Sequence, residues 1–168
     1  MRLFFGLPFD AVSRAAFLSA QDELRRHAVK GKFTDGENLH LTLAFLGEVE
    51  RERLPALRAL AAAMGRETFP LIFRSLRCFP GGIWYLAPDP CPALMDAQSR
   101  LSEALQSEGF RLEARPYVPH LTLGRKIVLD GNGPPEEARP SPISAAGGPV
   151  RLFLSHREEG RLRYSVIG

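Results

Sequence analysis

The sequence predicts an α+β fold: a single bilobal domain, residues 1–168, made of two pseudo-symmetric antiparallel-sheet lobes with outer helices and a central cleft. Two observations predict it. Segments with the periodicity of strands and of helices follow one another along the whole chain. A strand–helix–strand order also occurs twice over similar lengths, once from Leu3 to His40 and once from Trp84 to His120. This repetition suggests two related halves.

The first half is expected to begin with a strand over residues 2–7, followed by a helix that Asp10 caps. The helix is expected to bury one apolar face, made of Val12, Ala16, Leu24 and Ala28. A second strand is expected over residues 38–46. The next helix is expected to pack through Leu54, Leu57, Ala61 and Met64 and to end at Gly65.

The second half is expected to begin with strands over residues 69–78 and 83–87, joined by the Pro80-Gly81-Gly82 turn. A helix from near Pro92 to Gly109 is expected to bury Leu94, Ala97, Leu101 and Ala104. Two strands are expected next, over residues 111–115 and 119–126. The Gly/Pro-rich residues 130–149 are typical of a mobile surface loop. The chain is then expected to close with a hairpin, turning at residues 158–160, that buries Val150, Leu152, Leu154, Leu162, Tyr164 and Val166 on one face.

Composition narrows the classes of function. The formal net charge of +3 and the isoelectric point of about 9.2 permit an anionic partner without requiring one. The chain has neither a signal-peptide pattern nor an apolar run of membrane-spanning length. Cys78 and Cys91 have no metal-binding or redox spacing. We therefore expect a reduced, cytoplasmic protein without a membrane contact.

A tetrapeptide, His-Leu-Thr-Leu, begins at His40 and recurs unchanged at His120. In a strand, residues two apart share a face, so His40 lies beside Thr42 and His120 beside Thr122, while the leucines take the opposite face. Each strand can thus be anchored by leucine and present an imidazole beside a hydroxyl. Four histidines occur in the whole chain, and the repetition of one motif around two of them predicts a shared site.

Two such pairs facing each other suit phosphodiester chemistry. One neutral imidazole can serve as a base while the other, protonated, serves as an acid. Threonine hydroxyls can donate hydrogen bonds to phosphate oxygens. The alternative is that His40 and His120 are ordinary strand histidines with threonine as a strand former. A zinc site is a further alternative, but catalytic zinc takes about three protein ligands and no third one has suitable spacing, so no metal is expected.

The two motifs, with the flanking residues 40–47, the form Pro-His-Leu-Thr-Leu-Gly-Arg at residues 119–125 and the opening residues 2–8, resemble the 2H phosphoesterase superfamily. They are similar to its bacterial RNA 2',3'-cyclic phosphodiesterases, also called 2'-5' RNA ligases. The resemblance implies one 2H phosphoesterase domain that hydrolyses terminal 2',3'-cyclic phosphates to 2'-phosphomonoesters without a cofactor. It also implies that His40 is the proton donor and His120 the proton acceptor.

The partners that the resemblance implies are RNA ends with a 2',3'-cyclic phosphate, tRNA halves among them, bound by a monomer. Reverse 2'-5' ligation is allowed by microscopic reversibility. Three alternatives stay open: a 2H enzyme for another cyclic phosphate, a 2H enzyme for 2'-5' linkages, and a nucleotide- or RNA-binding module. Turnover of a simple nucleoside 2',3'-cyclic phosphate separates an enzyme from a binder.

Two further residues are predicted to bind substrate. The resemblance implies that Arg125 contacts the phosphate, although its odd spacing from His120 requires a bulge or turn at Gly124 to bring it to the same face. Tyr117 is the favoured aromatic for stacking on a base, whereas Phe45 is expected in the core. Neither His27 nor His156 is expected in the site. The terminal arginines are interpreted as a solubilising edge, with an RNA-backbone strip as the alternative; they are Arg151, Arg157, Arg161 and Arg163.

Overall fold

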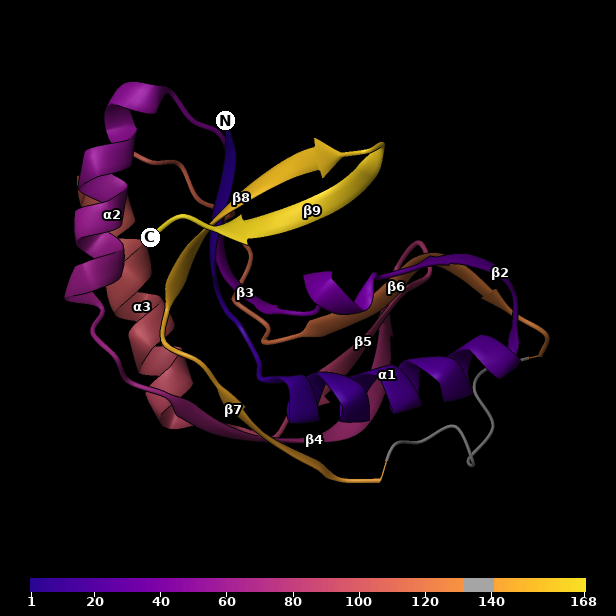
Figure 1. Ribbon diagram of the computed structural model, residues 1–168. Helices are drawn as coiled ribbons and strands as arrows, with labels where there is room; N and C mark the ends of the chain where they lie inside the picture. The colour runs from indigo at the N-terminus through magenta and orange to yellow at the C-terminus, as the bar shows by residue number, and fades with distance from the viewer. Residues whose placement is uncertain (132–140) are drawn as a thin grey trace.

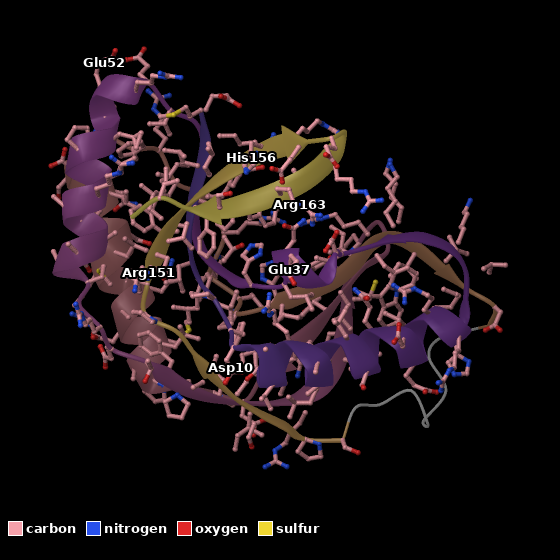
Figure 2. The ribbon with its side chains drawn as sticks, in the orientation of Figure 1. Asp10, Glu37, Glu52, Arg151, His156 and Arg163 are labelled. Atoms are coloured by element: carbon pink, nitrogen blue, oxygen red, sulfur yellow. The ribbon has the colours of Figure 1, made fainter. Side chains whose placement is uncertain are left out.

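The computed structural model describes residues 1–131 and 141–168. Its strands are β1 (Arg2–Leu7), β2 (Ala28–Phe33), β3 (Leu41–Glu48), β4 (Phe69–Phe79), β5 (Ile83–Pro88), β6 (Leu121–Leu129), β7 (Ile143–Gly147), β8 (Arg151–Glu158) and β9 (Arg161–Val166). Its helices are α1 (Ala11–Arg26), α2 (Leu54–Ala63) and α3 (Pro92–Ser107), with single 3-10 turns η1 (Gly36–Asn38) and η2 (Arg51–Arg53). The predicted cap of α1 is confirmed, because the Asp10 carboxylate accepts a hydrogen bond from the Ser13 amide at 2.7 Å (Figure 2).

The predicted two-lobed α+β architecture is confirmed, with the difference that both lobes belong to one sheet. The nine strands of the described chain form one curled antiparallel sheet, in the order β7-β4-β5-β6-β3-β1-β8-β9 with β2 beside β6 (Figure 1). The lobes meet at a single residue pair between β3 and β6, Leu41 opposite Leu121. Both of these leucines are fully buried. The two repeated motifs therefore lie side by side at the middle of the sheet.

Two of the helices, α1 and α3, are exchanged between the lobes, whereas α2 contacts β8 of its own lobe. Helix α1 follows β1 of the first lobe but contacts β7 of the second, and its Phe17 lies edge-on to Phe73 of β4 with ring centroids 5.0 Å apart. Helix α3 follows β5 of the second lobe but contacts β3 of the first. Figure 1 shows α2 and α3 together on one side and α1 along the other. The exchange ties the lobes into one continuous core.

Each motif strand carries one extra residue immediately after its threonine. Along β3, Thr42 pairs with Gly6 and Ala44 pairs with Phe5, which leaves Leu43 as an extra residue. Along β6, Thr122 pairs with Tyr85 and Gly124 with Trp84, which leaves Leu123 extra. Both are β-bulges, and each bulge reverses the alternation of faces beyond it. The two motifs thus share their local backbone as well as their sequence.

A glutamine from the exchanged helix contacts each bulge. The Gln21 amide of α1 donates hydrogen bonds to the carbonyls of Leu123, at 2.9 Å, and Thr34, at 2.8 Å. The Gln98 amide of α3 donates to the carbonyl of Leu43 at 3.4 Å. Gln21 is almost completely buried, and a buried carbonyl that lacks a partner costs about 1–3 kcal/mol. Both amides therefore bond a carbonyl of a bulge, and the Leu123 carbonyl also accepts from the Thr34 amide at 2.9 Å.

The predicted buried faces need correction in two helices. Helix α1 buries Ser13, Phe17, Gln21 and Leu24, and Val12 is 80% exposed, because packing of Phe17 against β4 sets the rotation of the helix. Ala28 belongs to β2 instead of α1. In α3 the last buried position is Leu105 and not Ala104. The buried faces of Leu57 and Ala61 in α2, and of Leu94, Ala97 and Leu101 in α3, are confirmed.

Several predicted strands also differ. Residues 111–115 form no strand, the strand predicted from residue 38 begins at Leu41, and β2 was not predicted. Within the loop predicted over residues 130–149, β7 pairs with β4, and residues 132–140 lie outside the described chain. The terminal hairpin is confirmed, but the single buried face predicted for it is wrong. Leu162, Tyr164 and Val166 pair with Arg157, Ser155 and Phe153, so they lie on the face opposite to Leu152 and Leu154. Leu162 and Val166 are 44% and 52% exposed. That face of β9 belongs to the concave side of the sheet, which is open.

Candidate active site

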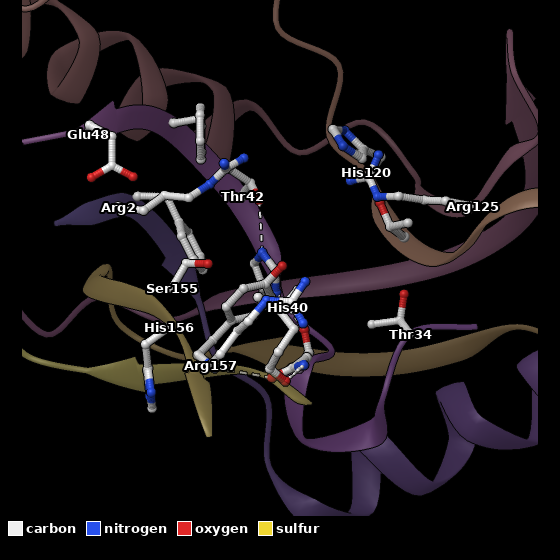
Figure 3. A pocket seen from close by; sticks show the side chains of 16 residues that line it. Arg2, Thr34, His40, Thr42, Glu48, His120, Arg125, Ser155, His156 and Arg157 are labelled. Carbon is white, nitrogen blue, oxygen red and sulfur yellow. Dashed lines mark hydrogen bonds between the residues drawn. The ribbon is translucent and has the colours of Figure 1, made fainter. Parts of the chain in front are cut away.

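The concave side of the sheet carries an open cleft of about 730 Å3 where the lobes meet. Five of the six predicted site residues line it: His40, Thr42, His120, Thr122 and Arg125 (Figure 3). The first two come from one lobe and the last three from the other. Both histidines directly precede their strands, and both threonines lie within them. The exchange of helices and the single β3–β6 contact bring together residues that are 80 positions apart in the chain.

The first histidine, His40, is fixed through both ring nitrogens. Its Nδ1 lies 2.6 Å from the carbonyl oxygen of Asn38, and its Nε2 lies 2.9 Å from the hydroxyl of Thr42. Because a carbonyl can only accept, Nδ1 carries the hydrogen and donates it. In the neutral ring, Nε2 then accepts the Thr42 hydroxyl proton. The reactive nitrogen of His40 therefore faces the cleft beside the threonine that shares its motif.

Aromatic rings surround His40. The centroid of its ring lies 4.7 Å from that of Phe4, 5.0 Å from that of Tyr164 and 6.0 Å from that of Phe153. This burial lowers the pKa of His40 to about 4, partly offset by the hydrogen bond to Asn38, and the positive charges of His120 and Arg125 lower it further. His40 is consequently neutral at pH 7 in the free protein.

The second histidine, His120, has the same backbone partner but a different environment. Its Nδ1 donates a hydrogen bond to the carbonyl of Val118 at 2.7 Å, as His40 does to the carbonyl two residues before it. Phe79 and Tyr85 meet its ring edge to face, with centroids 5.3 and 5.7 Å away. Within the described residues, its Nε2 has no hydrogen-bond partner. Both histidines thus present the same nitrogen, since both use Nδ1 to hold the backbone.

The bulge at Leu123 explains how Arg125 reaches the cleft although its odd spacing from His120 would place it on the other face of a regular strand. With one extra residue after Thr122, Arg125 returns to the face of His120 and lines the cleft. Figure 3 shows its side chain extending toward His120. The structural condition for a phosphate contact by Arg125 is therefore met.

The matching position of the first motif is Phe45. The bulge at Leu43 turns this side chain into the cleft, where it is 49% exposed. The Arg2 guanidinium lies over its ring, 4.9 Å from the centroid. The sequence-based expectation that Phe45 belongs to the core is wrong, because the bulge reverses its face.

Tyr117 does not line the cleft. Its hydroxyl donates a hydrogen bond to the carbonyl of Thr42 at 2.9 Å, and burial raises its pKa. Tyr117 precedes β6 and Thr42 lies in β3, so this bond links the two motif segments. A stacking contact between Tyr117 and a base stays a prediction, for which this geometry gives no support.

Two residues that the sequence reasoning did not identify organise the site. Asn38, which is buried, donates through its side chain to the carbonyl of Leu162 at 2.8 Å and accepts from the amide of Tyr164 at 3.2 Å. Its own carbonyl holds His40. The second residue, Tyr164, lines the cleft with its ring against His40, and burial raises its pKa despite the nearby Arg125 and Arg2. No local sequence pattern marks either residue, because Asn38 and Tyr164 are 126 positions apart in the chain.

The remaining histidines lie apart from the pair. His27 is 3.7 Å from Glu23 of the same helix. His156 borders the cleft, but its Nε2 is 2.8 Å from the Ser165 hydroxyl and Figure 3 shows its ring directed away from His40. Among residues 1–131 and 141–168, no group of three histidine, cysteine, aspartate or glutamate side chains could hold a metal ion. No helix of this same part of the chain is long and apolar enough to cross a membrane.

The fold and the paired motifs define a class of protein. Residues 12–138 match the model of the 2'-5' RNA ligase superfamily. This match covers most of the chain and includes both motifs. The chain therefore belongs to the 2'-5' RNA ligase superfamily, as its resemblance to the 2H phosphoesterases implied.

Particular relatives agree with this membership. The chain is 33% identical over 132 residues to the RNA 2',3'-cyclic phosphodiesterase of Methanothermobacter thermautotrophicus, covering 74% of this chain and 71% of that protein. It is 31% identical over 139 residues to that of Escherichia coli, covering 82% and 77%. Among solved structures, E. coli LigT complexed with 3'-AMP superposes with a TM-score of 0.82 and 30% identity, over 99% of this chain and 95% of that one.

Proposed function

We propose that the protein hydrolyses the 2',3'-cyclic phosphate at the end of an RNA strand to a 2'-phosphomonoester. The observation that carries this proposal is that His40 and His120 line one cleft together with both motif threonines, and that each histidine bonds the backbone through Nδ1, which leaves Nε2 for the chemistry. The names of the relatives from M. thermautotrophicus and E. coli support the choice of substrate. The arginines of the cleft suit a phosphate group.

The proposed reaction is one in-line displacement at phosphorus. His120 Nε2 takes a proton from a water molecule as the water oxygen bonds to phosphorus. The bond between phosphorus and the 3'-oxygen breaks, and protonated His40 gives its Nε2 proton to that oxygen. The products are a free 3'-hydroxyl and a 2'-phosphate. The two protonated positions have exchanged, and proton transfer with solvent restores them.

The donor role requires His40 to gain a proton when substrate binds, because its pKa is about 4 in the free protein. A bound phosphate anion supplies the opposite charge that favours the protonated ring and offsets the positive charges of Arg125 and His120. The hydrogen bond from Nδ1 to the Asn38 carbonyl also favours the charged form. Binding of phosphate and protonation of His40 are therefore coupled in this mechanism.

The other cleft residues stabilise charge and hold the nucleoside. The Thr42 and Thr122 hydroxyls and the Arg125 guanidinium are suited to the non-bridging oxygens, where negative charge gathers in the transition state. The exposed Phe45 ring offers a stacking surface for a base, a contact worth about 1–3 kcal/mol in single-strand binding. In this proposal Phe45, instead of Tyr117, is the aromatic residue that stacks on the base.

The same geometry accounts for a ligation direction. If the 5'-hydroxyl of a second strand replaces water, His120 deprotonates that hydroxyl and His40 again protonates the leaving 3'-oxygen. The phosphate then joins the 2'-oxygen of one strand to the 5'-oxygen of the other. The ligation product of this site is therefore a 2'-5' linkage.

The test is incubation of the purified protein with an oligoribonucleotide ending in a 2',3'-cyclic phosphate. Phosphorus NMR distinguishes the products, and we expect a 2'-phosphate, unaffected by EDTA. No product from this RNA or from a nucleoside 2',3'-cyclic phosphate would reject the function. A 3'-phosphate product would reverse the roles of the histidines, and loss of turnover in EDTA would show that a metal takes part.

A further inference from the structure

We propose that β1 and the β8–β9 hairpin form a binding site for the RNA strand on the 5' side of the cyclic nucleotide, centred on Arg157 and Arg2. This inference rests on the proposed function, since it concerns the rest of the same substrate. A nucleoside 2',3'-cyclic phosphate fills only the region around the two histidines. The remaining strand of an RNA end must leave the cleft over one of its sides.

The register of the strands gathers polar side chains on the hairpin side of the cleft. Arg2 of β1 pairs with Ser155 of β8, and Ser155 pairs with Tyr164 of β9. Neighbouring strands are about 4.8 Å apart, so these three side chains form one row across the sheet. Arg157 lies two residues farther along β8, opposite Leu162. All five residues line the cleft that contains the histidines.

The charges on this side are available to an anion. Within residues 1–131 and 141–168, neither Arg2 nor Arg157 makes an ion pair: Arg2 lies over the Phe45 ring, and Arg157 donates to the carbonyl of Gly160 at 2.9 Å. The acidic residue of the cleft lining is Glu48, whose carboxylate is 3.1 Å from the amino terminus. The hairpin side of the cleft is thus positively charged and accessible.

The other terminal arginines do not share this position. The Arg163 guanidinium pairs with Asp35 at 2.9 Å, and neither Arg151 nor Arg161 lines the cleft. Figure 2 shows Arg151 well away from His156 and Arg163 of the hairpin. The hairpin is therefore no uniform basic strip, and the site reduces to the arginines that face the histidines.

The opposite side of the cleft offers a weaker route. Basic residues beyond Arg125 on that side, among them Lys30 and Lys32 of β2 and Arg77 of β4, are exposed but do not line the cleft. An RNA strand that begins at the histidines meets Arg157 and Arg2 directly, whereas it must leave the cleft before it reaches the lysines. The hairpin side is favoured for this reason.

The first test compares two substrates with the same terminal base: a nucleoside 2',3'-cyclic phosphate and a short oligoribonucleotide ending in it. We expect Arg157→Gln to lower the ratio of kcat/KM for the oligonucleotide to kcat/KM for the nucleotide by roughly 3- to 10-fold. Arg161→Gln removes the same charge from the same hairpin outside the cleft and should leave this ratio unchanged. Arg157→Lys should restore most of it, because lysine supplies the charge without the bond to Gly160.

The second test does not depend on turnover. It measures fluorescence anisotropy of a labelled oligoribonucleotide ending in a 2'-phosphate at several salt concentrations. Arg157→Gln should reduce the slope of log Kd against log salt by about 0.7, the value of one lost phosphate contact on a single strand. An unchanged slope and substrate ratio in Arg157→Gln, or a larger effect in Lys32→Gln, would overturn the strand site. If the wild-type protein bound this probe through Arg157 yet hydrolysed neither substrate, only the proposed function would fail.

Discussion

The two His-Leu-Thr-Leu segments of this protein are identical in sequence and closely alike in local structure. Each histidine donates from Nδ1 to the carbonyl two residues before it. Each threonine is followed by a bulged leucine, and each bulge is contacted by a glutamine of the exchanged helix. The same local geometry therefore accompanies the same tetrapeptide in both lobes.

Their surroundings differ. His40 lies among three aromatic rings and is bonded to Thr42. Burial, together with the positive charges of His120 and Arg125, lowers its pKa to about 4 despite the hydrogen bond to Asn38. The rings of Phe79 and Tyr85 meet His120 edge to face, and among the described residues no group bonds its Nε2. Five positions after the histidine, one strand has Phe45 and the other Arg125. In the proposed mechanism, the Phe45 side of the cleft therefore holds the terminal nucleoside and the Arg125 side holds the reacting phosphate.

The largest expected effect follows from removing either imidazole. His40→Ala and His120→Ala should each lower kcat by roughly 10²- to 10⁴-fold, the usual contribution of a positioned acid or base. Because both act on one displacement, the double variant should lose far less than the product of the two single losses. Steady-state kinetics on the cyclic nucleotide measures this, with circular dichroism as the check of folding. A folded single variant with near-normal kcat would refute the paired mechanism.

Substitution of Arg125 or Phe45, each five residues after its histidine, should have a smaller effect, and the two variants should change different kinetic parameters. Arg125→Gln should lower kcat by roughly 10- to 100-fold, because it removes a charged hydrogen bond from the developing phosphate charge. Phe45→Ala should mainly raise KM, because a stacked base is lost. Separate kcat and KM values for both variants provide the measurement. The comparison would fail if both variants changed the same parameter to the same extent.

The lowered pKa of His40 should make the fold sensitive to acid. In the unfolded chain the imidazole titrates near 6.5, so between about pH 6.5 and pH 4 the unfolded state binds more protons. Stability should therefore fall as the pH is lowered through this window, by about 3 kcal/mol from this group. Urea unfolding at several pH values measures it, with His40→Gln as the reference. An equal pH dependence in the variant would show that His40 makes no such contribution.

The smallest expected effect is a difference in stability between variants of the two glutamines that contact the bulges. Gln21→Met removes the bonded donor of the part-buried Thr34 carbonyl and one of the two donors of the Leu123 carbonyl, which keeps its bond from the Thr34 amide at 2.9 Å. The loss should cost about 1–3 kcal/mol of stability. Gln98→Met loses a longer bond, of 3.4 Å, in a partly buried place and should cost less. Thermal unfolding of the two variants compares them. A greater loss in Gln98→Met would contradict the view that the second motif depends more on its glutamine.

Much of this architecture is predictable from the sequence. The repeat at His40 and His120 identifies the centre of the site, because chemistry and strand periodicity agree there. The need for a bulge near Gly124 is also visible, since only a change of face brings Arg125 to the histidines. Periodicity does not place Phe45 in the cleft, because the bulge at Leu43 depends on pairing with β1 and on a carbonyl bond to α3.

The remaining parts of the site depend on contacts across long sequence separations. Asn38 joins His40 to Tyr164 through a bond over more than 120 residues, and no local pattern indicates such a partner. Strand β2 is almost fully exposed, with lysines and glycine in place of alternating apolar residues, so its sequence lacks the periodicity of a strand. The rotation of α1 was missed for a similar reason, because Phe73 of the distant β4 determines it.

The division of labour between the two histidines can be measured with one altered substrate. A 2',3'-cyclic nucleotide with sulfur in place of the 3'-bridging oxygen expels a thiolate, which needs no general acid because thiols are far more acidic than alcohols. If His40 is the proton donor, the kcat of His40→Ala should approach that of the wild-type protein on this substrate, whereas His120→Ala should stay as impaired as on the oxygen substrate. Rescue of His120→Ala instead of His40→Ala, or an equal loss in both, would contradict the account.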